Sequence, residues 1–406
     1  LGIQVPAERI VESAKTSQAV CMSGLITPSL TQMIKVLQQL NEAGLSIPVV
    51  VGGAATSKLH TALKMATVYN GPAAKATTAI DTVNLVNKLT DHQACLSLYE
   101  EQEAMRRQKT ENIALADYSS IKIEIPEYEI FKPQQEGMFT LRPSIEEVLP
   151  YIDWNYFFFS LQLYGKYPEI LKNEEAAQVF EHAQNILKNI IADKSLEIEA
   201  RFAVVEAENI GDDVIRLSDG AKTVELPMLR RQTQMQEPLS IADTVARHDY
   251  LSVFALTAGV GLSKLMSEAE TPYDALIIKL IADRLTEATG EYLHHKVRSE
   301  YWGFDKTPFT FDEKQYQGRR MCFGYPACPD HSLKRRVFDF LQVEQNTNMR
   351  LTDSYMITPE ESLCGLFTSR GEYFSVGRVD ETQLAHYSKH IGLSVEELRE
   401  LLPNNI

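Results

Sequence analysis

The chain has 406 residues and a mass of 45.8 kDa, enough for about two or three domains. Its 40 Lys and Arg against 55 Asp and Glu give a formal charge of −15, which argues against general affinity for nucleic acid or anionic membranes. The sequence contains no apolar run of about 18 residues, so no membrane span is predicted. The five cysteines are irregularly spaced, which favours a reducing, cytoplasmic setting over a disulfide framework. The sequence begins Leu1-Gly2-Ile3, without Met or a signal peptide, so we expect a piece of a longer chain.

Residues 1–90 alternate between strand-like and helix-like segments. Apolar strands are expected at 19–25 and 47–51, and helices from Pro28 to about Gly44, from about Ser57, and over 78–89. This alternation predicts a parallel sheet with helices on both faces. Two or three strands can be counted, fewer than the five or so of a complete doubly wound sheet.

A change of composition marks the next segment. Residues 100–109 are densely charged and predict an exposed helix with i,i+4 pairing. Residues 121–132 alternate loosely around Pro126, which predicts an extended segment rather than a central strand. We expect the hinge between the two halves of the chain within residues 100–136.

From about Phe139 the pattern is that of hairpin strands and separate long helices, which predicts an α+β domain. Expected helices are 145–152, 176–191, 273–301, 335–344 and one from Ser394. Expected strands are 200–205, 213–217, 222–226, 251–259 and a pair at 354–357 and 373–378.

Polar and glycine residues follow both N-terminal strands. Residues 23–29 (Ser-Gly-Leu-Ile-Thr-Pro-Ser) and Gly52-Gly53 lie where the carboxyl ends of parallel strands meet, the edge at which such sheets bind ligands. Ser23 and Thr27 offer hydroxyl groups there, and the glycines permit a close approach. Taken alone, a capped helix and a tight turn explain these residues better.

Three further groups invite a chemical interpretation. Asp153 precedes a run of aromatic residues and either caps a helix or binds a cationic group in an aromatic pocket. Arg320 opens an irregular loop over 318–331 and is suited to a carboxylate. Cys328 and His331 have half the spacing of a zinc site, but no second pair accompanies them, so metal is disfavoured. Glu291, His294 and His295 share one helix, where surface positions are the better interpretation.

Three motifs in order resemble the C-terminal part of cobalamin-dependent methionine synthases. The first combines residues 23–29 with 51–54 (Val-Gly-Gly-Ala), the second 151–154 (Tyr-Ile-Asp-Trp) with 165–168 (Gly-Lys-Tyr-Pro), and the third is 324–331 (Gly-Tyr-Pro-Ala-Cys-Pro-Asp-His). The resemblance spans nearly the whole chain. It implies a truncated flavodoxin-like cobalamin-binding domain over 1–92, a charged helix and linker over 93–138, and an activation domain with an antiparallel sheet and long helices over 139–406.

In that family, methyltransferase enzymes pass a methyl group from methyltetrahydrofolate to homocysteine through cobalamin. The resemblance implies that this chain carries the part that restores oxidised cobalamin by reduction and methylation with S-adenosylmethionine. The implied partners are a flavodoxin-type reductase and the homocysteine- and folate-binding modules of the same enzyme. No catalytic base is implied, because methyl transfer to a cobalt centre needs none.

The cobalamin half of the resemblance implies five contact positions. Ser23 and Thr27 meet the nucleotide tail, Gly52 and Gly53 line its channel, and Ala79 lies beside it. The family's axial-histidine motif, Asp-x-His-x-x-Gly, does not occur in this sequence, so the implied cobalamin site is incomplete and no metal ligand is expected.

The activation half implies a second set of contacts. Asp153 binds the amino end of S-adenosylmethionine, Arg320 its carboxylate, and the Cys322 backbone and Tyr325 side chain help to place it. The implied S-adenosylmethionine contacts are Asp153, Glu291, Arg320, Cys322, Tyr325 and Tyr373. Residues 321–323 are Met-Cys-Phe where the family usually has Pro-Ala-Pro, and Lys314 stands where it has an acid. These departures favour the alternative, a non-catalytic module that docks a flavodoxin-type reductase or another subunit.

Overall fold

The computed structural model describes residues 1–406 except 3–4, 25–27, 54, 112–114 and 235. Its N-terminal part is a parallel sheet of β1 (Val20–Ser23), β2 (Val49–Gly52) and β3 (Ala73–Lys75), in that order. Strands β1 and β2 confirm the two apolar segments expected from the sequence. The short, alanine-rich β3 carries too weak a strand pattern to be placed from the sequence.

Helices cover both faces of this sheet. They are α1 (Ala7–Ala14), which the sequence did not predict, α2 (Pro28–Glu42), α3 (Lys58–His60), the π-helical turn Thr61–Met65 and α4 (Ala79–Lys88). Ser57 and Thr78 cap α3 and α4 by accepting hydrogen bonds from backbone N–H groups. Val49 and Val51 belong to one buried cluster and Val50 to another, as a strand buried on both faces requires.

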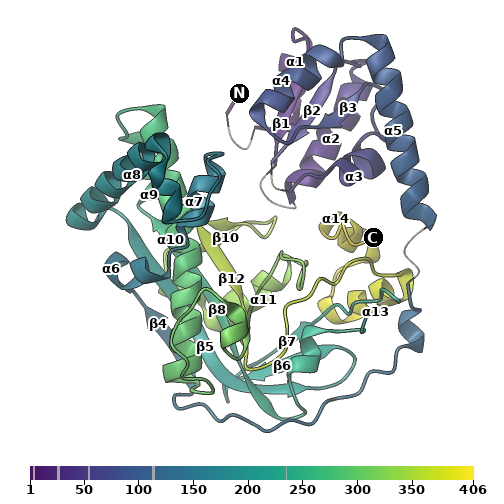
Figure 1. Ribbon diagram of the computed structural model, residues 1–406. Coiled ribbons are helices and arrows are strands. Elements are labelled where there is room, and N and C mark those ends of the chain that lie inside the picture. The colour runs from purple at the N-terminus through teal and green to yellow at the C-terminus, as the bar shows by residue number, and fades with distance from the viewer. Residues whose placement is uncertain (3–4, 25–27, 54, 112–114, 235) are drawn as a thin grey trace.

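A long connection follows. Helix α5 (His92–Glu111) runs along one side of the N-terminal sheet (Figure 1), and its Gln102 side chain donates a hydrogen bond to the carbonyl of Ala73 at 2.7 Å. After a short 3-10 turn at Tyr118–Ser120, residues 121–136, all of them described, form neither helix nor strand. The charged helix and the extended segment are thereby confirmed.

The second part is built on a seven-stranded antiparallel sheet in the order β7-β6-β5-β8-β12-β9, with β4 paired to β5. Its strands are β4 (Gly137–Leu141), β5 (Glu197–Asn209), β6 (Val214–Ser218), β7 (Thr223–Pro227), β8 (Asp249–Val260), β9 (Arg319–Cys322) and β12 (Ser362–Thr368). Along β5, Phe202 and Val204 face one buried cluster, and Ala203 and Val205 face the other. Both faces of the sheet are therefore covered.

One set of helices packs around the long helix α10 (Pro272–Lys296), which lies along β8 and continues into a π-helical turn at Val297–Tyr301. The others are α6 (Ile145–Val148), the 3-10 turn Leu149–Tyr151, α7 (Trp154–Ser160), the turn Glu169–Lys172, α8 (Glu174–Asp193) and α9 (Leu262–Ser267). Their apolar faces form a single buried cluster. Among the described residues, no helix combines the length and apolar character needed to cross a membrane.

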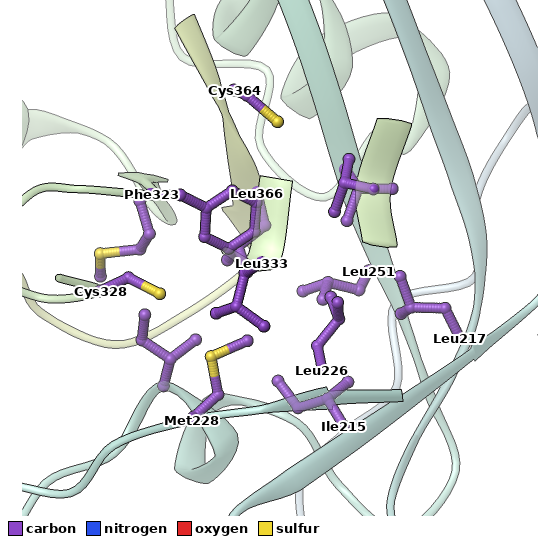
Figure 2. Close-up of a cluster of buried hydrophobic side chains, with 14 of the residues drawn as sticks. Ile215, Leu217, Leu226, Met228, Leu251, Phe323, Cys328, Leu333, Cys364 and Leu366 are labelled. Atoms are coloured by element: carbon purple, nitrogen blue, oxygen red, sulfur yellow. The ribbon is translucent and has the colours of Figure 1, made fainter. Parts of the chain in front are cut away.

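The opposite face of the sheet is covered by elements from the last part of the chain, residues 333–401. The elements are α11 (Leu333–Leu341), α12 (Val343–Asn346), the pair β10 (Arg350–Leu351) and β11 (Ile357–Thr358), α13 (Glu381–Ile391) and α14 (Val395–Leu401). Figure 2 shows part of the core that they share with the sheet, in which Leu333 of α11 lies among side chains of β6, β7, β8 and β12. The expected helix at 335–344 is thus confirmed but broken, because Gln342 adopts the left-handed conformation.

The sequence placed one strand pair wrongly. Residues 373–378 form no strand, and β11 pairs with β10 instead. Apolar side chains occur at alternate positions here because Phe374 and Val376 both pack into the core. The backbone of this segment instead bonds to the 318–331 loop, from Val376 N–H to Pro326 C=O at 2.9 Å. The true strand β12 is apolar on both faces and contains Gly365, where a Cβ would lie 2.2 Å from the Met321 carbonyl oxygen. Neither β12 nor α13 was predicted.

Candidate functional site

A compact ionic cluster lies where β9 meets α10. The Arg320 guanidinium donates from Nη2 to Glu287 Oε2 and to Glu291 Oε1, both at 2.9 Å. The two glutamates are four residues apart and so share one face of α10. The Tyr325 hydroxyl donates to Glu287 Oε1 at 3.2 Å, and Arg320 Nη1 lies 3.7 Å from Cys322 Sγ.

The helix has a glycine where the guanidinium lies against it. A Cβ on Gly290 would stand 3.0 Å from Arg320 Nη1 and 3.1 Å from its Cζ, so the bare helix backbone accommodates the flat group. Burial alone would raise the pKa of Glu287, but the charge and hydrogen bonds of Arg320 outweigh it and hold that pKa below its usual range. The cluster therefore presents carboxylates together with a guanidinium to any ligand.

The loop after β9 is a tight turn with several backbone hydrogen bonds. Gly324 N–H bonds to Cys328 C=O at 2.7 Å, and Cys328 N–H to Tyr325 C=O at 2.9 Å. Gly324 has φ +92°, and a Cβ there would lie 2.2 Å from the His331 ring. Phe323 N–H also bonds to Cys364 C=O at 3.0 Å. The proline that the family usually has at this position could not make this bond, because proline has no backbone N–H. The turn is what directs Tyr325 toward Glu287.

Buried polar groups form hydrogen bonds at the end of this loop. Lys334 Nζ lies 2.6 Å from His331 Nδ1. Asp330 accepts hydrogen bonds from the Ser332 hydroxyl at 2.8 Å and the Tyr387 hydroxyl at 2.7 Å. Burial, with the neighbouring charge of Lys334, lowers the pKa of His331 to about 3, so its imidazole is neutral at pH 7 and accepts a hydrogen bond from Lys334.

This depressed pKa predicts acid sensitivity. The unfolded chain binds a proton at the ordinary histidine pKa of about 6.5, whereas the folded chain does not until about pH 3. The stabilisation is therefore present above about pH 6.5 and is lost as pH falls toward 3. Between pH 7 and 5, we expect this residue to account for a loss of about 2 kcal/mol in the free energy of unfolding. Urea denaturation at pH 7 and pH 5 measures this loss. In His331→Asn, the drop in the free energy of unfolding between the two pH values should be smaller by about 2 kcal/mol. In a control variant of an exposed histidine, His248→Gln, the drop should be the same as in the unchanged chain.

The remaining implied S-adenosylmethionine contacts lie around this cluster. Tyr373 is 44 % exposed, and its hydroxyl faces the backbone of Ala327 in the loop. Asp153 is half-buried and caps α7, accepting from Asn155 N–H at 2.9 Å. Helix α7 packs on α10, and Arg284 of α10 lies 5.6 Å from the centre of the Tyr156 ring. Asp153 thus adjoins the same helix as Glu287 and Glu291, but its hydrogen bonds go to Asn155 and not to Arg320.

The N-terminal sheet has a cavity of about 320 Å³ at the carboxyl edge of its strands. Ser23, Gly52, Gly53 and Ala79 all line it, and Gln162, from the turn after α7, contributes to its wall. A Cβ on Gly53 would lie 2.3 Å from the Gly24 carbonyl oxygen, so only glycine fits there. Thr27, the fifth implied cobalamin contact, lies outside the described residues.

The structure corrects the interpretation of the α10 histidines as surface residues. His294 is fully buried, with its ring stacked on Phe367 at 5.0 Å, and burial, with nearby Arg320, holds its pKa well below the usual value. His295 lies 2.7 Å from the Tyr151 hydroxyl. Neither residue joins Glu291 in a group that could hold a metal ion among the residues that the structure describes.

Sequence reasoning missed Glu287 and Gly290. Both lie on the predicted long helix, four residues and one residue before Glu291. The i,i+4 spacing of Glu287 and Glu291 predicts that both acids lie on one face of the helix. It does not predict a site, because Arg320, some thirty residues later, is brought opposite them only by the tertiary structure.

The fold and the site together define a class of protein: an antiparallel α+β domain with a cluster of two glutamates and one arginine. A family model described as "Vitamin B12 dependent methionine synthase, activation domain" matches residues 144–392. The chain belongs to this family, and membership places it among methyltransferases as the reactivation part. A solved structure described as "Crystal Structure of the MetH Reactivation Domain bound to AdoHcy" is similar at 31 % identity and a TM-score of 0.64, covering 74 % of this chain and 97 % of that chain.

Proposed function

We propose that the chain binds S-adenosylmethionine at the Glu287–Glu291–Arg320 cluster and takes part in the reductive methylation that restores cobalamin. The observation that carries the proposal is the convergence of Glu291, Arg320, Cys322 and Tyr325 from two separate elements and one loop. Support also comes from the similar reactivation domain, whose structure is described as bound to AdoHcy.

The charges near the cluster suit this ligand. S-adenosylmethionine carries a sulfonium and an ammonium cation and one carboxylate. The cluster and its surroundings offer two guanidinium groups, Arg284 and Arg320, against the three carboxylates of Asp153, Glu287 and Glu291. A net negative surrounding favours a cationic ligand, and Arg320 has one N–H on Nη1, besides the one directed at Cys322 Sγ, for the ligand carboxylate.

For the N-terminal part, we propose a truncated flavodoxin-like cobalamin-binding domain over 1–92, joined through 93–138 to an activation domain over 139–406. Cobalamin would supply the metal centre that accepts the methyl group. The cavity lined by Ser23, Gly52, Gly53 and Ala79 can admit a flat or extended group, because Gly53 has no side chain to narrow it. Its wall includes Gln162 of the activation part, so the strand edge opens toward that part.

We further propose a flavodoxin-type reductase as the electron donor, and the homocysteine- and folate-binding modules of the same enzyme as partners. Electrons must come from outside, because the restoring reaction consumes a reductant as well as the methyl donor.

Calorimetric titration of the chain with S-adenosylmethionine tests the proposal. We expect saturable binding that is weakened about 10- to 100-fold in Asp153→Asn and in Arg320→Lys, since each change removes a charge-assisted or bidentate hydrogen bond. Asparagine keeps the cap of α7 that Asp153 supplies, so the first variant changes charge rather than fold.

Arg216→Lys provides the matched control, because Arg216 is an ion-paired arginine on β6 outside the cluster. Its affinity should equal that of the unchanged chain. Absence of binding by a well-folded chain would overturn the proposal and favour the non-catalytic docking module.

A further inference from the structure

A second cluster of ionisable side chains lies outside the site described above. Asp212, His386 and His390 each present one ligand atom, and these atoms lie within 4.8 Å of one another. The two histidines are one turn apart on α13, and Asp212 lies in the turn between β5 and β6. We propose that these three residues bind a divalent first-row transition metal, with zinc as the best match.

The donor set carries the choice of metal. Two imidazoles and one carboxylate suit zinc and its neighbours, whereas magnesium and calcium prefer oxygen ligands alone. Three protein ligands leave a fourth position for water in a tetrahedral site. Ligand atoms around a tetrahedral zinc lie about 3.4 Å apart, so the exposed Asp212 and the two partly buried histidines need only a small inward movement to close on the ion.

The backbone presents all three ligands from anchored positions. Asp212 and Asp213 both have positive φ, at 55° and 58°, which turns Asp212 outward while Asp213 points inward to Arg230. The His390 carbonyl accepts a hydrogen bond from Arg336 at 2.6 Å, which anchors the end of α13. The start of that helix is joined to the turn at Tyr118, whose N–H bonds to Asp380 at 3.1 Å.

A supporting shell sets the tautomer of one histidine. The Tyr118 hydroxyl donates to Asp213 Oδ2 at 3.0 Å, so its oxygen is free to accept from His386 Nδ1–H, 3.4 Å away. That tautomer leaves the lone pair of His386 Nε2 for a metal, an arrangement typical of metal-bound histidines. Lys389, next to His390 on α13, is a cation that opposes an ion here.

Titration of the chelator-treated chain with Zn²⁺ tests the proposal by calorimetry, and Co²⁺ provides a visible absorption readout of the same site. We expect one ion per chain, with affinity lowered about 100-fold or more in His386→Gln and in His390→Gln. Tyr118→Phe keeps all three ligands and should weaken binding about 10-fold through the lost supporting bond. Zinc should also raise the Tm of the unchanged chain but not of the two histidine variants.

His248→Gln is the matched control, because His248 is an exposed histidine paired with Glu208 outside the cluster. It should bind zinc as the unchanged chain does. An absence of zinc binding, or binding that survives both histidine substitutions, overturns the proposal. The readouts do not involve S-adenosylmethionine, so this result is independent of the function proposed above.

Discussion

Replacing Arg320 with methionine should lower the free energy of unfolding by about 3 kcal/mol. The change leaves Glu287 and Glu291 facing each other on α10 without the guanidinium that both now contact at 2.9 Å. We take the lower end of the range for a broken buried pair, because the Glu287 side chain keeps 36 % exposure. Urea denaturation at pH 7 measures the loss.

A compensated variant separates stability from binding. Combining Arg320→Met with Glu287→Gln and Glu291→Gln removes the uncompensated charges and should restore most of the lost stability. Binding of S-adenosylmethionine should be strongly weakened in this triple variant, since the Arg320 guanidinium proposed for the ligand carboxylate is gone. Equal destabilisation of the single and triple variants would show that packing of Arg320 on Gly290, rather than charge, stabilises this contact.

Substituting Gly324 with alanine should cost about 2–4 kcal/mol and displace the loop that carries Tyr325. Two effects add: the residue has φ +92°, and the new Cβ would stand 2.2 Å from the His331 ring. That ring cannot easily retreat, because it is buried and bonded to Lys334. Thermal or urea denaturation measures the stability, and calorimetric titration shows whether the ligand site survives.

Gly220→Ala is the matched control for this experiment. Gly220 has φ +85°, nearly the same backbone conformation, but nothing lies within 4 Å of the added Cβ. We expect a cost of about 1 kcal/mol there, from backbone strain alone. Similar losses in the two variants would mean that the contact between Gly324 and His331 contributes little.

Local patterns predicted most helices and strands. Expected strands at 200–205 and 251–259 correspond to β5 and β8, and the helix expected over 273–301 is α10 with its π-helical extension. The two strands are marked by apolar runs, and the helix begins at the Thr271 cap with Pro272 in its first turn; both signals depend on neighbouring residues alone. Strand β12 and helix α13 were missed, because Gly365 interrupts the short apolar run of β12, and α13 lacks a strong apolar stripe.

The sequence alone determined the parallel α/β pattern of the first part, the α+β pattern of the second part and the family resemblance. Periodicity and motif order are properties of the chain itself, so they can be read without coordinates. Tertiary structure alone decided that Glu287 and Glu291 share Arg320, that His294 is buried, and that Asp212 meets His386 and His390. Each of these contacts joins residues from different elements, and their approach depends on how strands and helices pack rather than on any local pattern.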